Sequence, residues 1–191
     1  ETAQTELCRP GVEFEPSRIE AAYSLGSLAS DGCEAKAVQV LAGVFESGAE
    51  ASRRAAQYGL AAAGLVAVPH LSRLIAARLQ HLKRQMPLHL QACEADGATT
   101  LVRSWLAQLC KLTHSLGEAA AAAPTREIAS QIWQVADEAD LVSGVHSDGG
   151  VCSEARRLRT VSMTALGCLG ARAVQQDNAE LSSLLAQFLV E

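Results

Sequence analysis

The sequence predicts an all-α fold, a right-handed α-solenoid of about four stacked helical hairpins. Three observations lead to this prediction. Apolar residues make up 49% of the chain and aromatic residues only 4%, so Ala, Leu and Val must fill the core, which favours closely packed helices. Residues 52–79 (SRRAAQYGLAAAGLVAVPHLSRLIAARL) contain two helical patterns with a turn between them. Related patterns recur at a spacing of roughly 35 to 47 residues, the range of helical-repeat arrays.

The hairpin at residues 52–79 carries start and stop signals for both of its helices. Ser52 is the expected N-cap of the first helix, because a serine hydroxyl can accept a hydrogen bond from an unpaired amide of the first turn. Gly64 is the expected C-cap, since positive φ costs glycine no strain. The small Gly59 lets a partner helix approach closely. Pro69 suits the first turn of the second helix, which is expected to continue until Pro87 with an apolar stripe of Leu71, Leu74, Ile75 and Leu79.

Three other segments resemble the first helix of this hairpin. The first of these segments is residues 17–30. An offset of 35 residues aligns Ser17 with Ser52, Arg18 with Arg53, Ala21 with Ala56 and Leu25 with Leu60. Residues 102–112 align more weakly, with Leu106 opposite Leu60. Residues 155–174 place Leu166 opposite Leu60 and Gly170 opposite Gly64.

The remaining boundaries follow from caps, prolines and glycines. Residues 1–16 are expected to be a leader or linker, and residues 17–191 the solenoid domain; that this domain is a segment of a longer protein stays open, because the chain begins with Glu1 rather than Met. The expected elements are a first hairpin at 17–30 and 34–46, a third hairpin from a Thr99 or Thr100 cap to residue 123, a helix capped by Thr125 with Glu127 in its first turn, a loop at 141–153, and a last hairpin at 154–170 and 177–190.

In these segments the chain resembles the HEAT-repeat family, in the short-hairpin form that is also found in bilin lyase-like proteins. The resemblance rests on SRRAAQYGLAAAGLVAVPHLSRLI and on the Arg-containing, Ala-rich first helices of the other copies. It implies a HEAT/armadillo-like architecture, and it implies binding more often than catalysis.

Charge and cysteine spacing restrict the function classes. The net charge of −5 argues against a general nucleic-acid binder, and no uninterrupted apolar run is long enough for a membrane span. No two of the six cysteines form a CxxC pair, which excludes a zinc ribbon or a thioredoxin-type motif. Cys110 and Cys168 are expected to be small buried hydrophobes. A disulfide among Cys8, Cys33, Cys93 and Cys152 stays open, although a chain of this length does not require one.

No catalytic or metal-binding motif stands out in the sequence. None of the five histidines is followed by Glu, as a di-iron site of repeat proteins would need, so no metal and no other cofactor is expected. His146, Asp148 and Cys152 are close in sequence, but we expect them to lie in a flexible loop. The Gly149-Gly150 pair lacks the Lys-Ser/Thr of a phosphate-binding loop. The chain is therefore expected not to be an enzyme.

Arginines are the candidate partner-binding residues. Near the starts of the expected first helices lie Arg18, Arg53, Arg54, Arg103, Arg156, Arg157 and Arg159. One interpretation pairs them with Glu20, Glu50, Glu154 and neighbouring repeats; the other makes them a row that grips carboxylates of a partner, a role for which Arg is preferred. A second candidate is the concave face of the second helices, with Arg73, Arg78, His70 and His81.

The leading hypothesis is a protein-interaction scaffold, a subunit of a larger assembly that docks an extended protein partner on its concave face or its Arg-bearing edge. The rival, which rests on the family resemblance alone, is a bilin lyase-like protein that handles a tetrapyrrole. A third hypothesis makes the chain a regulatory region of a larger enzyme. Nothing in the sequence identifies the compartment; an intracellular location, cytoplasmic or organellar, is the expectation.

Overall fold

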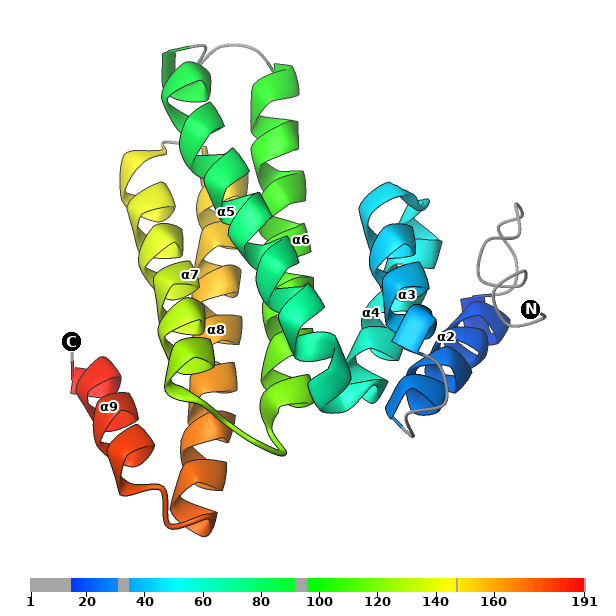
Figure 1. The fold of residues 1–191 in the computed structure, drawn as a ribbon. Coiled ribbons are helices and arrows are strands. Elements are labelled where there is room, and N and C mark those ends of the chain that lie inside the picture. The colour runs from blue at the N-terminus through cyan, green and yellow to red at the C-terminus, as the bar shows by residue number, and fades with distance from the viewer. Residues whose placement is uncertain (1–14, 31–34, 92–95, 147, 191) are drawn as a thin grey trace. The chain divides into compact units, whose positions relative to one another are not determined.

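The computed structural model describes residues 15–30, 35–91, 96–146 and 148–190, and throughout these ranges the regular secondary structure is helical (Figure 1). The all-α prediction is thus confirmed. The predicted leader lies outside the described residues, except that the first described helix already begins at Glu15. The elements are α2 (Glu15–Ser30), α3 (Ala35–Ser47), α4 (Glu50–Ala62), the 3₁₀-helix η1 (Gly64–Ala67), α5 (Val68–Gln91), α6 (Asp96–Ala120), α7 (Arg126–Val145), α8 (Gly149–Gln175) and α9 (Ala179–Val190).

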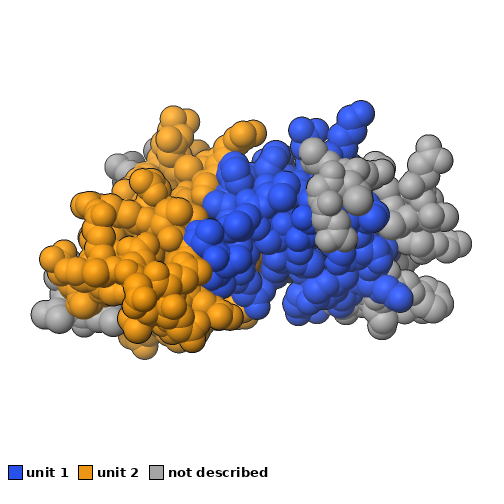
Figure 2. Space-filling model, turned by 60° about the horizontal axis from the view of Figure 1, so that its bottom comes forward, with its two compact units in different colours: residues 1–71, 118–123 blue, residues 72–117, 124–191 orange. Residues whose placement is uncertain are grey.

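The chain forms two compact units (Figure 2). Unit 1 comprises residues 1–71 and 118–123, and unit 2 comprises residues 72–117 and 124–191. No helix in the described part of the chain is long and apolar enough to cross a membrane.

In unit 1, α2 packs on both α3 and α4. The backbones of α2 and α4 approach so closely that a Cβ atom on Gly26 would lie 2.1 Å from the carbonyl oxygen of Gly59. Gly59 is close to Ala22, and Ala62 is close to Gly26, so the two helices run in the same direction where they meet. The partner helix that the small Gly59 was expected to admit is therefore α2. These are the two helices that the 35-residue offset aligns.

In unit 2, α7 and α8 pack side by side. A Cβ atom on Gly117 of α6 would lie only 2.7 Å from the Cβ of Ala165 on α8, so these two helices also approach closely. The Gln131 side chain of α7 donates a 2.7 Å hydrogen bond to the carbonyl oxygen of Ser72 on α5. Large aliphatic side chains of α6 and α7 are fully buried and supply much of the core: Leu106, Leu109, Leu112, Leu116 and Ile132.

The last helix, α9, packs against both α7 and α8. Trp133 of α7 stacks on Phe188 with ring centroids 4.8 Å apart and ring planes 7° from parallel. Leu185 of α9 is buried. A Cβ atom on Gly170 would lie 3.6 Å from the Leu185 Cδ1 atom, which is an ordinary van der Waals distance. Gly170 therefore lies inside α8 against α9, and the expectation that it ends a helix as Gly64 does is wrong.

Several boundary predictions are confirmed. Gly64 has φ +58° directly after α4, as its proposed C-cap role requires. Pro69 lies in the first turn of α5. The Thr125 hydroxyl accepts a hydrogen bond from the Ile128 amide and caps α7.

Two expected caps are wrong, because each lies inside a longer helix. Ser52 is buried in α4, which starts two residues earlier after Ala49, whose backbone is extended. Thr99 and Thr100 lie inside α6, which runs unbroken to Ala120 and so replaces both helices of the expected third hairpin. The expected stop at Pro87 is also wrong, since α5 continues to Gln91; a proline removes one backbone hydrogen bond without having to end a helix.

The expected loop at 141–153 is mostly helix. α7 continues to Val145 and α8 starts at Gly149. Asp148 makes this early start possible, because its carboxylate accepts a 2.7 Å hydrogen bond from the Val151 amide and caps α8. The two glycines that suggested a flexible loop form the first turn of that helix.

Candidate partner-binding surface

The eight candidate arginines divide between the two units. Arg18, Arg53 and Arg54 belong to unit 1, and Arg73, Arg78, Arg103, Arg156 and Arg157 belong to unit 2. Each unit is therefore considered separately as a binding surface.

Of the three candidate arginines in unit 1, Arg54 has an exposed side chain, whereas Arg18 and Arg53 do not. Arg18 is buried, with 7% of its surface exposed, and so contributes little area to any partner. Arg53 is half-buried and pairs with Glu50 one turn earlier, at 3.3 Å. This pair agrees with the interpretation in which the arginines pair with glutamates of the chain, Glu50 among them. Such a pair within one helix contributes about 0.3–0.5 kcal/mol.

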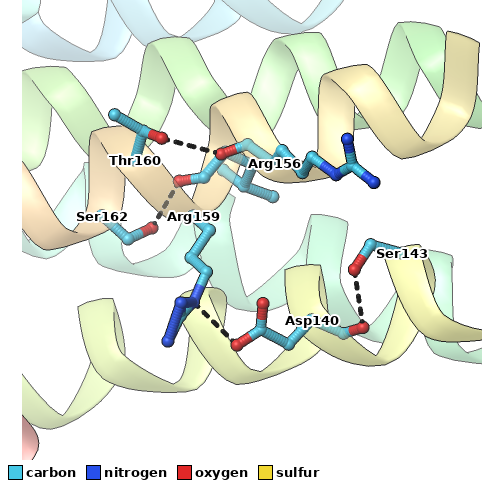
Figure 3. A network of polar contacts seen from close by, with 7 residues as sticks. Asp140, Ser143, Arg156, Arg159, Thr160 and Ser162 are labelled. Atoms are coloured by element: carbon cyan, nitrogen blue, oxygen red, sulfur yellow. Dashed lines mark hydrogen bonds and ion pairs between the residues drawn. The ribbon is translucent and has the colours of Figure 1, made fainter.

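Two arginines of α8 form ion pairs, one within the helix and one with the neighbouring helix α7. Arg157 pairs with Glu154 on the same helix, at 3.7 Å. Arg159 reaches across to α7, where its Nε lies 2.7 Å from a carboxylate oxygen of Asp140 (Figure 3). Arg156 extends away from that pair in the same view, and its side chain is exposed. The Arg159–Asp140 pair therefore joins the two helices, whereas Arg156 faces solvent.

Arg103 lies over the start of α8. A Cβ atom on Gly150 would be 3.1 Å from the central guanidinium carbon of Arg103 and equally far from an Asp148 carboxylate oxygen. A larger side chain at position 150 would push this arginine aside, and the space under the guanidinium explains why glycine suits a helical position there.

In the sequence cluster of His146, Asp148 and Cys152, the thiol and the carboxylate both contact backbone groups. The Cys152 thiol donates to the carbonyl oxygens of His146, at 3.1 Å, and of Ser143, at 3.6 Å. The Asp148 carboxylate is used as the cap of α8. Both polar groups thus stabilise the connection between α7 and α8.

Of the two cysteines that were expected to be buried, one is buried and the other is exposed. Cys110 on α6 is buried, and this burial is the main reason why its pKa is raised to about 12. Cys168 on α8 is exposed, so that expectation is wrong. Cys8, Cys33 and Cys93 lie outside the described residues.

Among the residues that are described, no three His, Cys, Asp or Glu side chains form a group that could hold a metal ion.

A basic surface of unit 2 lies on α5. Arg73, His81, Lys83 and Arg84 are exposed there, and Arg78 is half-buried. Lys83 is neutralised by Glu138 of α7, at 2.5 Å. His81 meets Trp105 of α6 edge-on, with ring centroids 4.6 Å apart. The sequence prediction named Arg73, Arg78 and His81 but not Arg84, which helical periodicity places on the same side as Arg73.

No family model, curated protein or solved structure matches this chain. The function is therefore argued from the residues and their geometry.

Proposed function

We propose that the chain is a non-enzymatic scaffold for protein–protein interaction, built as a HEAT-like α-solenoid that docks an extended partner. The observation that carries this proposal is the parallel packing of α2 on α4. In an α-solenoid each hairpin stacks on the next, so equivalent helices of successive hairpins lie alongside each other and point the same way. The two helices aligned by the 35-residue offset meet this requirement through Gly26, Gly59 and Ala22.

Stacked hairpins favour a binding role because they present extended surfaces made of many helices. On this chain the side chains of Arg54, Arg73, Arg84 and Arg156 are exposed. Guanidinium groups bind carboxylates through two parallel hydrogen bonds. A partner with acidic side chains is therefore the kind of protein that these surfaces would accept.

Affinity capture from native lysate with the full 191-residue chain, followed by mass spectrometry, tests this function. We expect partners that survive washing and that are lost in one of two variants, Arg53→Glu/Arg54→Glu for unit 1 or Arg73→Glu/Arg84→Glu for unit 2. An Arg126→Glu/Arg172→Glu variant changes the net charge equally and is the control. The absence of any partner, together with measurable turnover of a substrate, would reverse the proposal.

A further inference from the structure

Helix α5 differs from the rest of the chain in its charge. Its 24 residues, VPHLSRLIAARLQHLKRQMPLHLQ, include four Arg or Lys and three His but no Asp or Glu. The whole chain, in contrast, has a net charge of −5. A basic helix on an acidic protein is a local feature that the overall charge does not explain.

Four basic residues of α5, Arg73, His81, Lys83 and Arg84, lie on its solvent side. Leu74, Ile75, Leu79 and Leu82 are buried on the opposite side of the helix. Arg73 and Arg84 are exposed, and eleven residues separate them, so on a regular helix they point within about 20° of each other and lie roughly 16 Å apart along the axis. Neither of them makes an ion pair with any residue in the described part of the chain.

The surface between these two arginines is shallow. The exposed positions between them include Ala76, Ala77 and Gln80, whose short or uncharged side chains let another chain come close to the helix. At one side, His81 and the half-buried Trp105 add an aromatic edge. An extended peptide of about five residues covers the 16 Å between the two guanidinium groups.

We infer that this face of α5, from Arg73 to Arg84, binds an extended acidic segment of a partner protein, with a carboxylate at each arginine. This inference rests on the proposed function and names the chemistry of the partner. A nucleic acid fits less well, because it carries a phosphate at every nucleotide and calls for a broad basic surface, whereas this face offers two arginines and its Lys83 is paired with Glu138. A membrane surface fits less well too, because interfacial helices carry large apolar side chains beside their basic ones, and none of the exposed positions between these arginines carries a large aliphatic side chain.

The test uses the full chain and a fluorescein-labelled peptide of alternating glutamate and serine, about ten residues long, which is twice the length needed to span the two arginines. Fluorescence anisotropy is measured at low and at physiological ionic strength, with the matching glutamine–serine peptide as the neutral probe. We expect saturable binding of the acidic peptide that weakens with salt. Reversal of both charges in Arg73→Glu/Arg84→Glu should weaken it about tenfold or more.

The Arg126→Glu/Arg172→Glu variant separates a specific site from overall charge, because both variants change the formal charge by the same four units. We expect it to bind the acidic peptide within about threefold of wild type, since Arg126 and Arg172 lie on α7 and α8. An equal loss in both variants would overturn the inference. Circular dichroism melting curves identify a variant that has lost its fold, and single Arg73→Gln and Arg84→Gln variants then replace it.

Other occupants of the same face are distinguished in parallel. Tighter, Arg73- and Arg84-dependent binding of a single-stranded oligonucleotide, or of phosphatidylcholine vesicles containing phosphatidylserine, would overturn the inference, and so would an Arg73- and Arg84-dependent dimer in sedimentation. If lysate partners remain after Arg73→Glu/Arg84→Glu while the acidic peptide fails to bind wild type, the inference fails and the scaffold function stands. If neither peptide nor lysate protein binds, both fail.

Discussion

The Thr125 hydroxyl has two partners at the start of α7. It accepts a hydrogen bond from the Ile128 amide, at 3.4 Å, and it lowers the pKa of the Glu127 carboxyl. We expect Thr125→Ala to lower the free energy of unfolding by about 1 kcal/mol, measured by urea denaturation. Thr160→Ala removes an exposed hydroxyl in the middle of α8, where it bonds to the Arg156 carbonyl. This control should be neutral or slightly stabilising because alanine has the higher helix propensity, and an equal loss in both variants would contradict the capping role.

The lowered pKa of Glu127, beside the same cap, leads to a prediction about pH. The pKa of Glu127 is lowered from its ordinary 4.5, first by a hydrogen bond from its own backbone amide and then by the Thr125 hydroxyl. A carboxyl whose pKa is lower in the folded state adds stability above its unfolded pKa, and this contribution disappears as the pH falls through the folded value. NMR titration of the Glu127 carboxyl should show a higher pKa in Thr125→Ala than in wild type. An unchanged pKa would mean that the hydroxyl does not contact the carboxylate.

The cysteines of α6 and α8 should differ in reactivity. The thiolate is the reactive form, and burial raises the pKa of Cys110 to about 12, whereas Cys168 is exposed. We expect iodoacetamide at mildly alkaline pH to alkylate Cys168 in the folded protein and to leave Cys110 unmodified until urea is added. Peptide mass spectrometry measures both sites in one sample, and comparable labelling of Cys110 without urea would show that α6 is more accessible than its burial implies.

At the scale of the elements, the contact between α2 and α4 depends on glycine. A methyl group on Gly26 would lie 2.1 Å from the Gly59 carbonyl oxygen and 3.0 Å from the Ala62 Cβ, so the two helices would have to separate. We expect Gly26→Ala to lower the stability of unit 1 by about 1–3 kcal/mol, although alanine is the better helix former. Gly43 of α3 has no atom within 4 Å of the same position, and Gly43→Ala should stabilise by up to about 1 kcal/mol. A stabilising Gly26→Ala would show that α2 and α4 lie further apart.

The helix boundaries also show which sequence signals were sufficient to predict where a helix begins or ends. Gly64 and Thr125 were predictable because each signal acts within a few residues: a positive φ and a side-chain cap. The start of α8 was missed although its Asp148 cap is just as local, because the glycine composition indicated a loop. The Arg103 side chain, which comes from α6 and lies over Gly150, gives no such local signal. Tertiary contacts of this kind are not visible in a local pattern.

The candidate site was predictable to a similar extent. Arg73 and His81 were named from sequence but Arg84 was not, although the helix expected to reach Pro87 already contains Arg84 and helical periodicity places it on the same side as Arg73. The burial of Arg18 depends on packing within unit 1 and has no signal in the local sequence, since the same Ser-Arg pattern leaves Arg53 half-buried.

For the whole molecule, the division into two compact units predicts that unfolding is not a single step. Both tryptophans of the chain, Trp105 and Trp133, lie in unit 2, so their fluorescence reports that unit alone, whereas far-UV circular dichroism reports the helices of both. In a repeat architecture stability is approximately a sum of local terms, and a substitution inside one unit should leave the other largely unchanged. We therefore expect Gly26→Ala to shift the part of the circular dichroism transition in urea that belongs to unit 1 and to leave the tryptophan transition in place.

Gly117→Ala provides the reciprocal variant in unit 2, since its methyl group would lie 2.7 Å from the Ala165 Cβ, and it should shift the tryptophan transition to lower urea. Gly167→Ala on α8, where no atom lies within 4 Å of the new methyl group, is the matched control and should not lower it. If Gly26→Ala instead moves both transitions by the same amount, the two units unfold as one cooperative body. An acidic partner held on α5 would then stabilise unit 1 as strongly as unit 2, because a ligand that binds only the folded state stabilises everything that unfolds with its site.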